Sequence, residues 1–127
     1  MIDAKQLRRE YLELHCECAV CGMPWLGHGG WCECHHLVGR GAGKECFDNY
    51  LTLCDACHRA YHRGHGVRDK DGKRPPEITP GMLIAAKRRV DPDFDEAALL
   101  ALFRPDATEW PERWVPVDVP ESLRRFP

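Results

Sequence analysis

The sequence has no apolar run approaching the roughly 18 residues that a membrane-spanning helix needs. It also lacks the apolar stretch of a signal peptide after its first residues, so we expect a cytoplasmic protein with no membrane partner. The net charge of −2 argues against a uniformly basic nucleic-acid coat protein. With 127 residues and a mean hydropathy of −0.50, the chain has room for one compact soluble domain with a modest core.

Charge is unevenly distributed along the chain. Residues 35–74 carry eight basic residues against five acidic ones and hold five of the seven histidines, whereas residues 91–127 carry nine acidic residues against four basic ones. A basic middle indicates a localised anion-binding face, although ordinary scatter of surface charge could also produce it. Trp110, Trp114 and Phe126 lie in the acidic end, which disfavours stacking on DNA bases. We therefore assign them to packing or to a protein partner.

Local patterns predict most of the secondary structure. Asp3 can cap a helix over residues 4–14. The Thr79-Pro80 pair favours the start of another helix, because proline fits the first helical position and threonine the cap. The remaining predicted elements are short strands at 31–38 and 50–53, helices at 55–63 (ended by Gly64), 80–90 and 93–103, a loop at 64–79 and an extended tail over the last 23 residues.

Cysteine is the residue type in excess, with eight in the chain. In the cytosol thiols stay reduced, so the pattern indicates metal binding or catalysis before disulfides. Cys18-x2-Cys21 and Cys54-x2-Cys57 form two pairs separated by 32 residues. Four thiolates at this spacing meet the tetrahedral preference of structural Zn²⁺. The alternative is a set of buried or redox-active cysteines.

The other four cysteines have two interpretations. They could form a second metal site, or they could be buried free thiols, which pack as small hydrophobic side chains. We favour the second interpretation for Cys16, Cys32, Cys34 and Cys46.

Four of the histidines between and just after the cysteine pairs form a pattern. His35 and His36 are adjacent on a predicted strand and should point to opposite sides, unless local twist brings both to one cleft. His58 and His62 are four residues apart and share one helix face. Together they could bind a divalent ion and leave one imidazole free to accept a proton. Taken alone, each could equally be an ordinary surface or core residue.

The order of the cysteine pairs and histidines along the chain resembles that of the HNH endonucleases, a family with a ββα-metal core and a four-cysteine zinc site. The resemblance covers about residues 16–63 and rests on Cys18-x2-Cys21, His35-His36, Asn49 and Cys54-x2-Cys57-His58. It implies a small, zinc-stabilised α+β fold with a ββα-metal core, and the local patterns described above add flanking helices and an extended proline-rich tail. Together with the local patterns, it predicts an organisation within one compact domain overall: an N-terminal helix at 1–15, the nuclease core at 16–64 and a C-terminal helical extension and tail at 65–127.

The resemblance also implies residue roles. His36 would be the general base, and Asn49 would orient it through the hairpin. His35 and His58 would be ligands of the catalytic metal. His62 matches a position that serves as a further ligand or as a phosphate contact. We favour the phosphate contact.

Phosphodiester hydrolysis needs these groups because the phosphate charge repels nucleophiles and the alkoxide is a poor leaving group. A divalent ion would polarise the phosphate, and neutral His36 would take a proton from water. A site with two imidazoles suits Mg²⁺ or Mn²⁺, whereas three would favour Ni²⁺ or Zn²⁺. Basic side chains that could grip flanking phosphates, or simply be solvated, are Arg40, Lys44, Arg59 and Arg63.

The predicted function is therefore that of a metal-dependent DNA endonuclease, making nicks or double-strand cuts and leaving 5′-phosphate and 3′-hydroxyl ends. Action within a larger phage or mobile-element complex is compatible with it. The alternative is a non-catalytic, zinc-stabilised DNA- or protein-binding module. His36, Asn49 and His58 favour the enzyme, because a binding module has no use for a proton acceptor beside a metal pocket.

Overall fold

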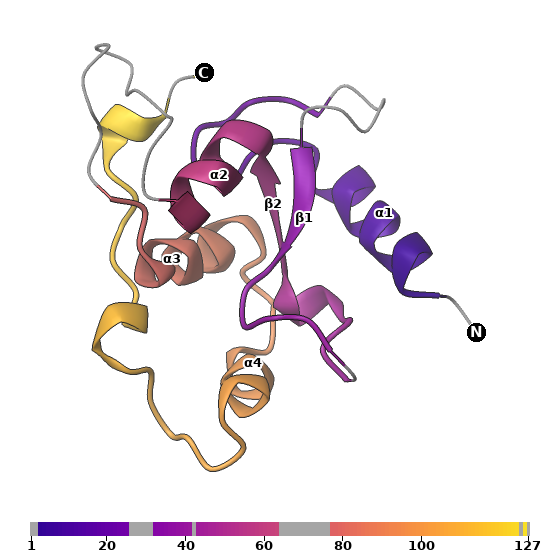
Figure 1. Cartoon of the computed structure of the whole chain (residues 1–127), viewed down its shortest axis with the longest axis vertical. Coiled ribbons are helices and arrows are strands. Elements are labelled where there is room, and N and C mark those ends of the chain that lie inside the picture. The colour runs from indigo at the N-terminus through magenta and orange to yellow at the C-terminus, as the bar shows by residue number, and fades with distance from the viewer. Residues whose placement is uncertain (1–2, 26–31, 42, 64–76, 125, 127) are drawn as a thin grey trace.

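The computed structural model describes residues 3–25, 32–41, 43–63, 77–124 and 126, and these form a small α+β fold around an antiparallel hairpin (Figure 1). Trp31, Gly64 and most of the loop predicted at 64–79 lie outside the described residues. The elements, with η for a 3₁₀ turn, are α1 (Ala4–Leu14), β1 (Cys32–His36), η1 (Phe47–Asn49), β2 (Tyr50–Cys54), α2 (Asp55–Arg63), α3 (Pro80–Val90), α4 (Glu96–Phe103), η2 (Glu112–Trp114) and η3 (Glu121–Leu123).

Capping side chains account for the starts of three helices. The Asp3 carboxylate accepts a backbone N–H at 2.8 Å and begins α1, and the Thr79 hydroxyl does the same at 3.2 Å before Pro80 of α3. Helix α4 begins later than the predicted residue 93 because Asp95 is its cap, accepting a backbone N–H at 2.9 Å. Across the described residues, every helix is too short or too polar to serve as a membrane span.

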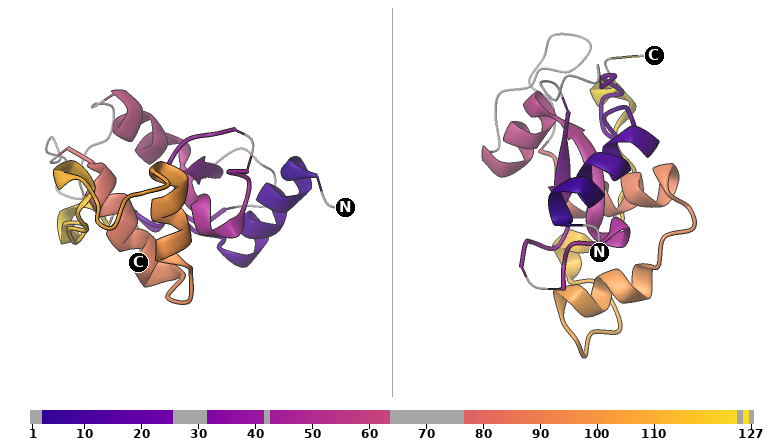
Figure 2. Two further views of the ribbon diagram at one scale, coloured as in Figure 1. Left: turned by 90° about the horizontal axis from the view of Figure 1, so that it is seen from below. Right: turned by 90° about the vertical axis from the view of Figure 1, so that its right-hand side faces the viewer.

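The two strands give the hairpin two different faces. Residues opposite each other in an antiparallel pair share a face, and the register runs from Cys32 opposite Cys54 to His36 opposite Tyr50. On one face, Tyr50 packs against Tyr11 of α1. Helix α1 lies across the strands in Figure 2. The other face presents His35 to α2, and α2 follows β2 without a loop. The arrangement is ββα-like.

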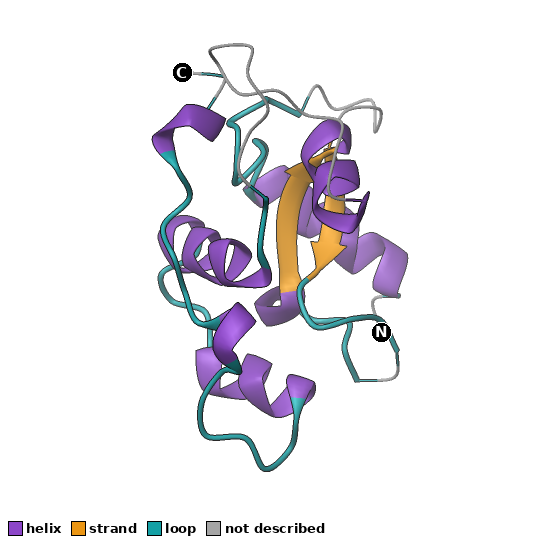
Figure 3. Ribbon diagram, turned by 60° about the vertical axis from the view of Figure 1, so that its left-hand side comes forward, coloured by secondary structure: helices purple, strands orange, loops and turns teal. Residues whose placement is uncertain are grey.

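The C-terminal segment packs onto the core. In the described residues after α4 there is no further α-helix or strand, but the segment forms the two 3₁₀ turns η2 and η3 (Figure 3), so it is less extended than predicted. Leu123 of η3 is 1% exposed, and the rings of Trp110 and Trp114 stack with centroids 5.8 Å apart. Burial of these side chains explains the turns and supports the assignment of the tail aromatics to packing.

A buried lysine joins three parts of the chain. Lys87 of α3 is 0% exposed, and its ammonium group donates to the Tyr11 hydroxyl at 3.1 Å and to the Phe47 carbonyl at 2.7 Å. It also pairs with Asp91 at 3.0 Å. Burial lowers the pKa of Lys87, while Asp91 opposes that shift. Each donated hydrogen bond satisfies a group that the fold has removed from water.

Candidate metal centres and active site

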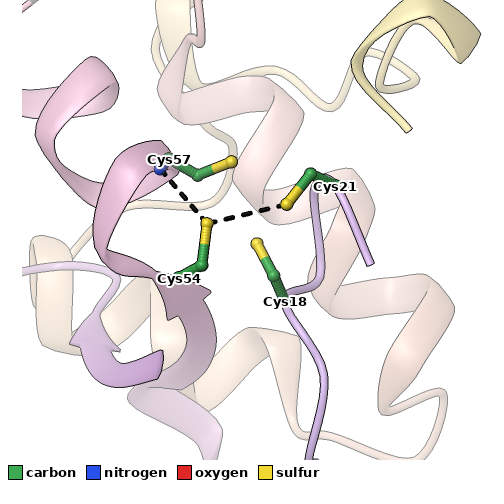
Figure 4. Close-up of side chains that lie close together, drawn as sticks. All are labelled: Cys18, Cys21, Cys54 and Cys57. Carbon is green, nitrogen blue, oxygen red and sulfur yellow. Dashed lines mark hydrogen bonds between the residues drawn. The ribbon is translucent and has the colours of Figure 1, made fainter. Parts of the chain in front are cut away.

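The four cysteines of the two C-x2-C pairs converge at one end of the hairpin (Figure 4). Cys18 and Cys21 come from the turn that precedes β1, Cys54 ends β2, and Cys57 lies in the first turn of α2. All four are at most 1% exposed, and their sulfur atoms lie within 4.8 Å of one another. The Cys21 and Cys54 sulfurs are 3.6 Å apart, close to the about 3.8 Å expected for two sulfurs on one tetrahedral zinc. This buried group can therefore hold a structural zinc.

The backbone around the cysteines is shaped for this convergence. The Gly22 amide donates to the Cys18 carbonyl at 2.9 Å, and Gly22 has a φ of +84°, which favours glycine. Crowding of the thiols also affects their ionisation: contact with Cys18 lowers the pKa of Cys21 and raises the pKa values of Cys54 and Cys57. A cation at the centre would allow all four to be thiolates.

Three histidines form a second group on the α2 side of the hairpin. The His35 Nδ1 lies 3.2 Å from the His58 Nε2, which lies 3.0 Å from the His62 Nε2. Two nitrogens on one tetrahedral zinc would be about 3.3 Å apart, so the spacing fits a shared ion. His62 thus lies with the other two, which supports a ligand role over the phosphate contact that the sequence favours.

The surroundings of His35 and His62 favour neutral imidazoles, which are the form that binds metals. Burial, together with His58 and His62, lowers the pKa of His35 to about 3. Burial likewise lowers the pKa of His62. The His35 Nε2 is buried and has no hydrogen-bond partner among the described residues, so Nδ1 is the nitrogen that faces His58 and His62. The Glu33 carboxylate lies 3.2 Å from the His58 Nδ1, which leaves the lone pair on Nε2 toward the other histidines.

His36 lies on the opposite face of β1 from His35, as the strand pattern predicts. Its Nε2 is 2.9 Å from each carboxylate oxygen of Glu45, and its ring meets Tyr50 edge-on at 5.3 Å. Both histidines nevertheless border the same open cavity of about 340 Å³. The residues lining this cavity are Cys34, His35, His36, Gly39, Arg40, His58 and His62.

Asn49 is buried, and its side chain forms hydrogen bonds with the backbone of the loop that follows β1. Its Oδ1 accepts from the Val38 amide at 2.9 Å, and its Nδ2 donates to the Gly39 and Lys44 carbonyls at 3.1 and 2.9 Å. Among the described contacts, none joins the Asn49 side chain to the His36 ring. The contact with that ring comes from Glu45, which the sequence does not single out because it belongs to a glycine-rich loop.

The basic residues expected to contact DNA are in different situations. Arg40 is exposed and borders the cavity. Lys44 is half-buried, and Arg59 is exposed but paired with Asp55 at 3.1 Å. The side chain of Arg63 lies outside the described part of the chain. Among the three whose side chains are described, Arg40 is thus the best placed to meet an anion in the cavity.

The remaining cysteines do not form a further metal group in the described part of the chain, where the four-cysteine and three-histidine groups are the ones that could hold an ion. Cys32 and Cys34 are buried, and burial raises the pKa of each to about 12. Cys46 is half-buried, and Cys16 is exposed, so the prediction of a buried thiol is wrong for Cys16. Cys32 and Cys34 are therefore thiols at neutral pH, in keeping with a packing role.

Comparisons of the chain with protein-family models, with curated proteins and with solved structures find no match. The observed features are a hairpin followed by a helix, a buried four-cysteine group and a three-histidine group beside a cavity.

Proposed function

We propose that the protein is a metal-dependent endonuclease of the HNH type that hydrolyses phosphodiester bonds in DNA. The observation that carries the proposal is the position of His36. It borders the same cavity as the three-histidine group but belongs to the other face of β1 and contacts none of those histidines in the described contacts. A proton acceptor beside a metal group, and separate from it, is the pair of functions that hydrolysis of a phosphodiester requires.

Each group around the cavity has a task in this reaction. A divalent ion held by the three histidines would supply Lewis acidity at the phosphate and at the leaving oxygen. His36 accepts the proton of the attacking water. The guanidinium of Arg40, exposed at the cavity, pairs with a phosphate oxygen and positions the backbone of the substrate. Asn49 keeps the loop between His36 and Arg40 in place through its hydrogen bonds to the backbone.

The histidine geometry also bears on the catalytic metal. Mg²⁺ and Mn²⁺ prefer oxygen ligands and keep several waters, which suits the two-imidazole site favoured by the sequence. Three imidazoles favour Ni²⁺ or Zn²⁺ instead. Because His62 lies 3.0 Å from His58, we propose that the softer ions support cleavage at least as well as Mg²⁺.

The test is incubation of the zinc-loaded protein with supercoiled plasmid in the presence of Mg²⁺, Mn²⁺, Ni²⁺ or EDTA. We expect nicked or linear plasmid with an added ion and none with EDTA. His36→Ala is the paired control and should bind DNA but cut it at least about 10²-fold more slowly. Binding without cleavage by the unmodified protein, under every metal, would support the non-catalytic module instead. Conversion to nicked or to linear product distinguishes single-strand from double-strand cutting.

A further inference from the structure

Glu45 is the meeting point of three elements. It lies in the loop between β1 and η1, and its carboxylate accepts a hydrogen bond from Arg8 of α1 at 2.8 Å. The Tyr50 hydroxyl of β2 donates to the same oxygen at 2.8 Å. The His36 Nε2 is 2.9 Å from both oxygens. Glu45 belongs to neither metal group, and it has no task in the reaction steps proposed above.

The protonation state of Glu45 determines which tautomer His36 adopts. Partial burial raises the pKa of the carboxyl group, but hydrogen bonds from His36, Tyr50 and Arg8 outweigh it and lower the pKa to about 2. An ionised carboxylate only accepts hydrogen bonds. The His36 Nε2 between its two oxygens must therefore carry a hydrogen. In a neutral imidazole, the lone pair is then on Nδ1.

The position of the ring leaves Nδ1 available for chemistry. His36 is 7% exposed, and it borders the cavity shared with the three histidines. Its Nε2 is occupied by Glu45, and none of the described contacts involves its Nδ1. Tyr50, which meets the ring edge-on, limits its rotation.

We propose that Glu45 is a positioning residue that holds His36 with Nε2 protonated and Nδ1 as the proton acceptor, and that Arg8 of α1 anchors it. The proposal rests on the proposed nuclease function and assigns the N-terminal helix a part in the site. When Nδ1 takes a proton, both ring nitrogens are protonated and the imidazolium faces the negative charge of Glu45. That charge stabilises the protonated ring.

The first measurement is the tautomer of His36, which does not depend on activity. In protein labelled with ¹⁵N-histidine, the His36 signals are assigned by their loss in His36→Gln. We expect the shifts of an Nε2-protonated neutral ring in the unmodified protein. In Glu45→Gln, whose amide can donate as well as accept, we expect a mixture of tautomers. An Nδ1-protonated ring in the unmodified protein would overturn the proposal without any variant.

The second measurement is cleavage kinetics. Glu45→Gln should lower kcat about 10–100-fold, the usual effect of losing a partner that orients an active-site histidine, with little change in KM. Glu45→Asp keeps the charge and should recover part of the loss. Glu13→Gln is the matched control, because Glu13 pairs with Arg9 on the exposed side of α1. It should leave both the tautomer and kcat unchanged.

A purely structural role for Glu45 predicts a different pattern. Tyr50→Phe removes one hydrogen bond to Glu45 and keeps the His36 contact, so it should preserve the tautomer and most of kcat. Equal losses in Tyr50→Phe and Glu45→Gln, with the His36 tautomer unchanged in both, would overturn the proposal. If the unmodified protein cleaves no DNA, the proposed function fails. Loss of the single tautomer in Glu45→Gln would still support the positioning role, and its persistence would still refute it.

Discussion

The four cysteines and the three histidines belong to the same hairpin–helix unit, yet the two groups differ in their exposure to solvent. The cysteines are at most 1% exposed and surround a closed centre. In the histidine group, His35 is buried, His58 is half-buried and His62 is exposed, and all three border a cavity. Structural zinc sites are closed by protein ligands, whereas catalytic metal sites keep a position for water or substrate. On this contrast in burial we propose a folding role for the cysteine group and a chemical role for the histidine group.

The two groups also differ in how the backbone supports them. The cysteines lie on turns and at the junction of β2 and α2, so their convergence requires the whole unit to fold. The histidines project from the regular faces of β1 and α2, which can keep their shape with the ion removed. We expect metal at the first group to be linked to folding and metal at the second to be exchangeable.

The largest expected effect comes from breaking the cysteine group. Cys54→Ser, or Cys18→Ser, should release zinc and unfold the domain, because zinc binding of about 10–16 kcal/mol equals or exceeds the stability of a typical domain. Elemental analysis and circular dichroism measure both effects. Cys46 is half-buried and lies outside the group, so Cys46→Ser is the control. Its melting temperature should be close to that of the unmodified protein. A Cys54→Ser protein of unchanged melting temperature would remove the distinction between the two groups.

The next effect concerns His36, which belongs to neither group. His36→Ala should lower the rate of plasmid cleavage about 10²-fold or more, the usual cost of losing a general base. Zinc content, metal affinity and DNA affinity should stay unchanged. The cleavage rate is measured under saturating metal. A rate near that of the unmodified protein would mean that His36 is not the base.

His62 decides how many ligands the open group has. His62→Ala should weaken binding of Ni²⁺ by more than the about 10–100-fold typical of an outer partner, and should shift the preference toward Mg²⁺ or Mn²⁺. Calorimetry after mild EDTA treatment, which should empty the histidine group and leave the cysteine zinc, measures the affinity. Weaker DNA binding with a flatter salt dependence and an unchanged metal preference would instead make His62 a phosphate contact.

The smallest expected effect comes from Glu33, whose carboxylate lies 3.2 Å from the His58 Nδ1. Glu33→Gln should reduce the affinity of the histidine group about tenfold, because the orientation of His58 is less well fixed. Zinc at the cysteines should be retained. Glu77→Gln, which removes an exposed pair with Arg113, is the matched control for loss of one surface charge. Equal metal affinities in the two variants would show that Glu33 has no part in the site.

Much of the fold follows from signals that act within a few residues. Asp3 and Thr79 are caps, and the observed helices begin directly after them. The start of α4 is displaced from residue 93 because Asp95 is its cap, and the Asp95 amide also donates to the Asp48 carboxylate, 47 residues away in sequence, at 2.9 Å. The path of the tail depends on Leu123 and other side chains reaching a core built by distant segments. No local pattern contains that information.

The same limit applies to the candidate site. Short spacings predict that Cys18 and Cys21 form a pair, and that His58 and His62 share a helix face. The contact between Glu45 and His36 spans nine residues and depends on the course of a glycine-rich loop. Glu33 and His58 are 25 residues apart in sequence. Carboxylates are common on protein surfaces, so nothing in the sequence distinguishes these two from the others.

The hydrogen bonds of the buried Lys87 ammonium indicate that the segment carrying the cysteine and histidine motif is too short to fold by itself. Its partners Tyr11 and Phe47 are 76 and 40 residues away, so α1, the hairpin region and α3 must all be present before these bonds form. A fragment of residues 16–63 would contain every motif cysteine and histidine, yet its Phe47 carbonyl would have lost this donor. Without α1, the Tyr50 ring that packs against Tyr11 would also be exposed to water, and burial of one large apolar side chain contributes about 1.5–3 kcal/mol. For expression or transplantation, the useful module therefore extends from α1 through α3.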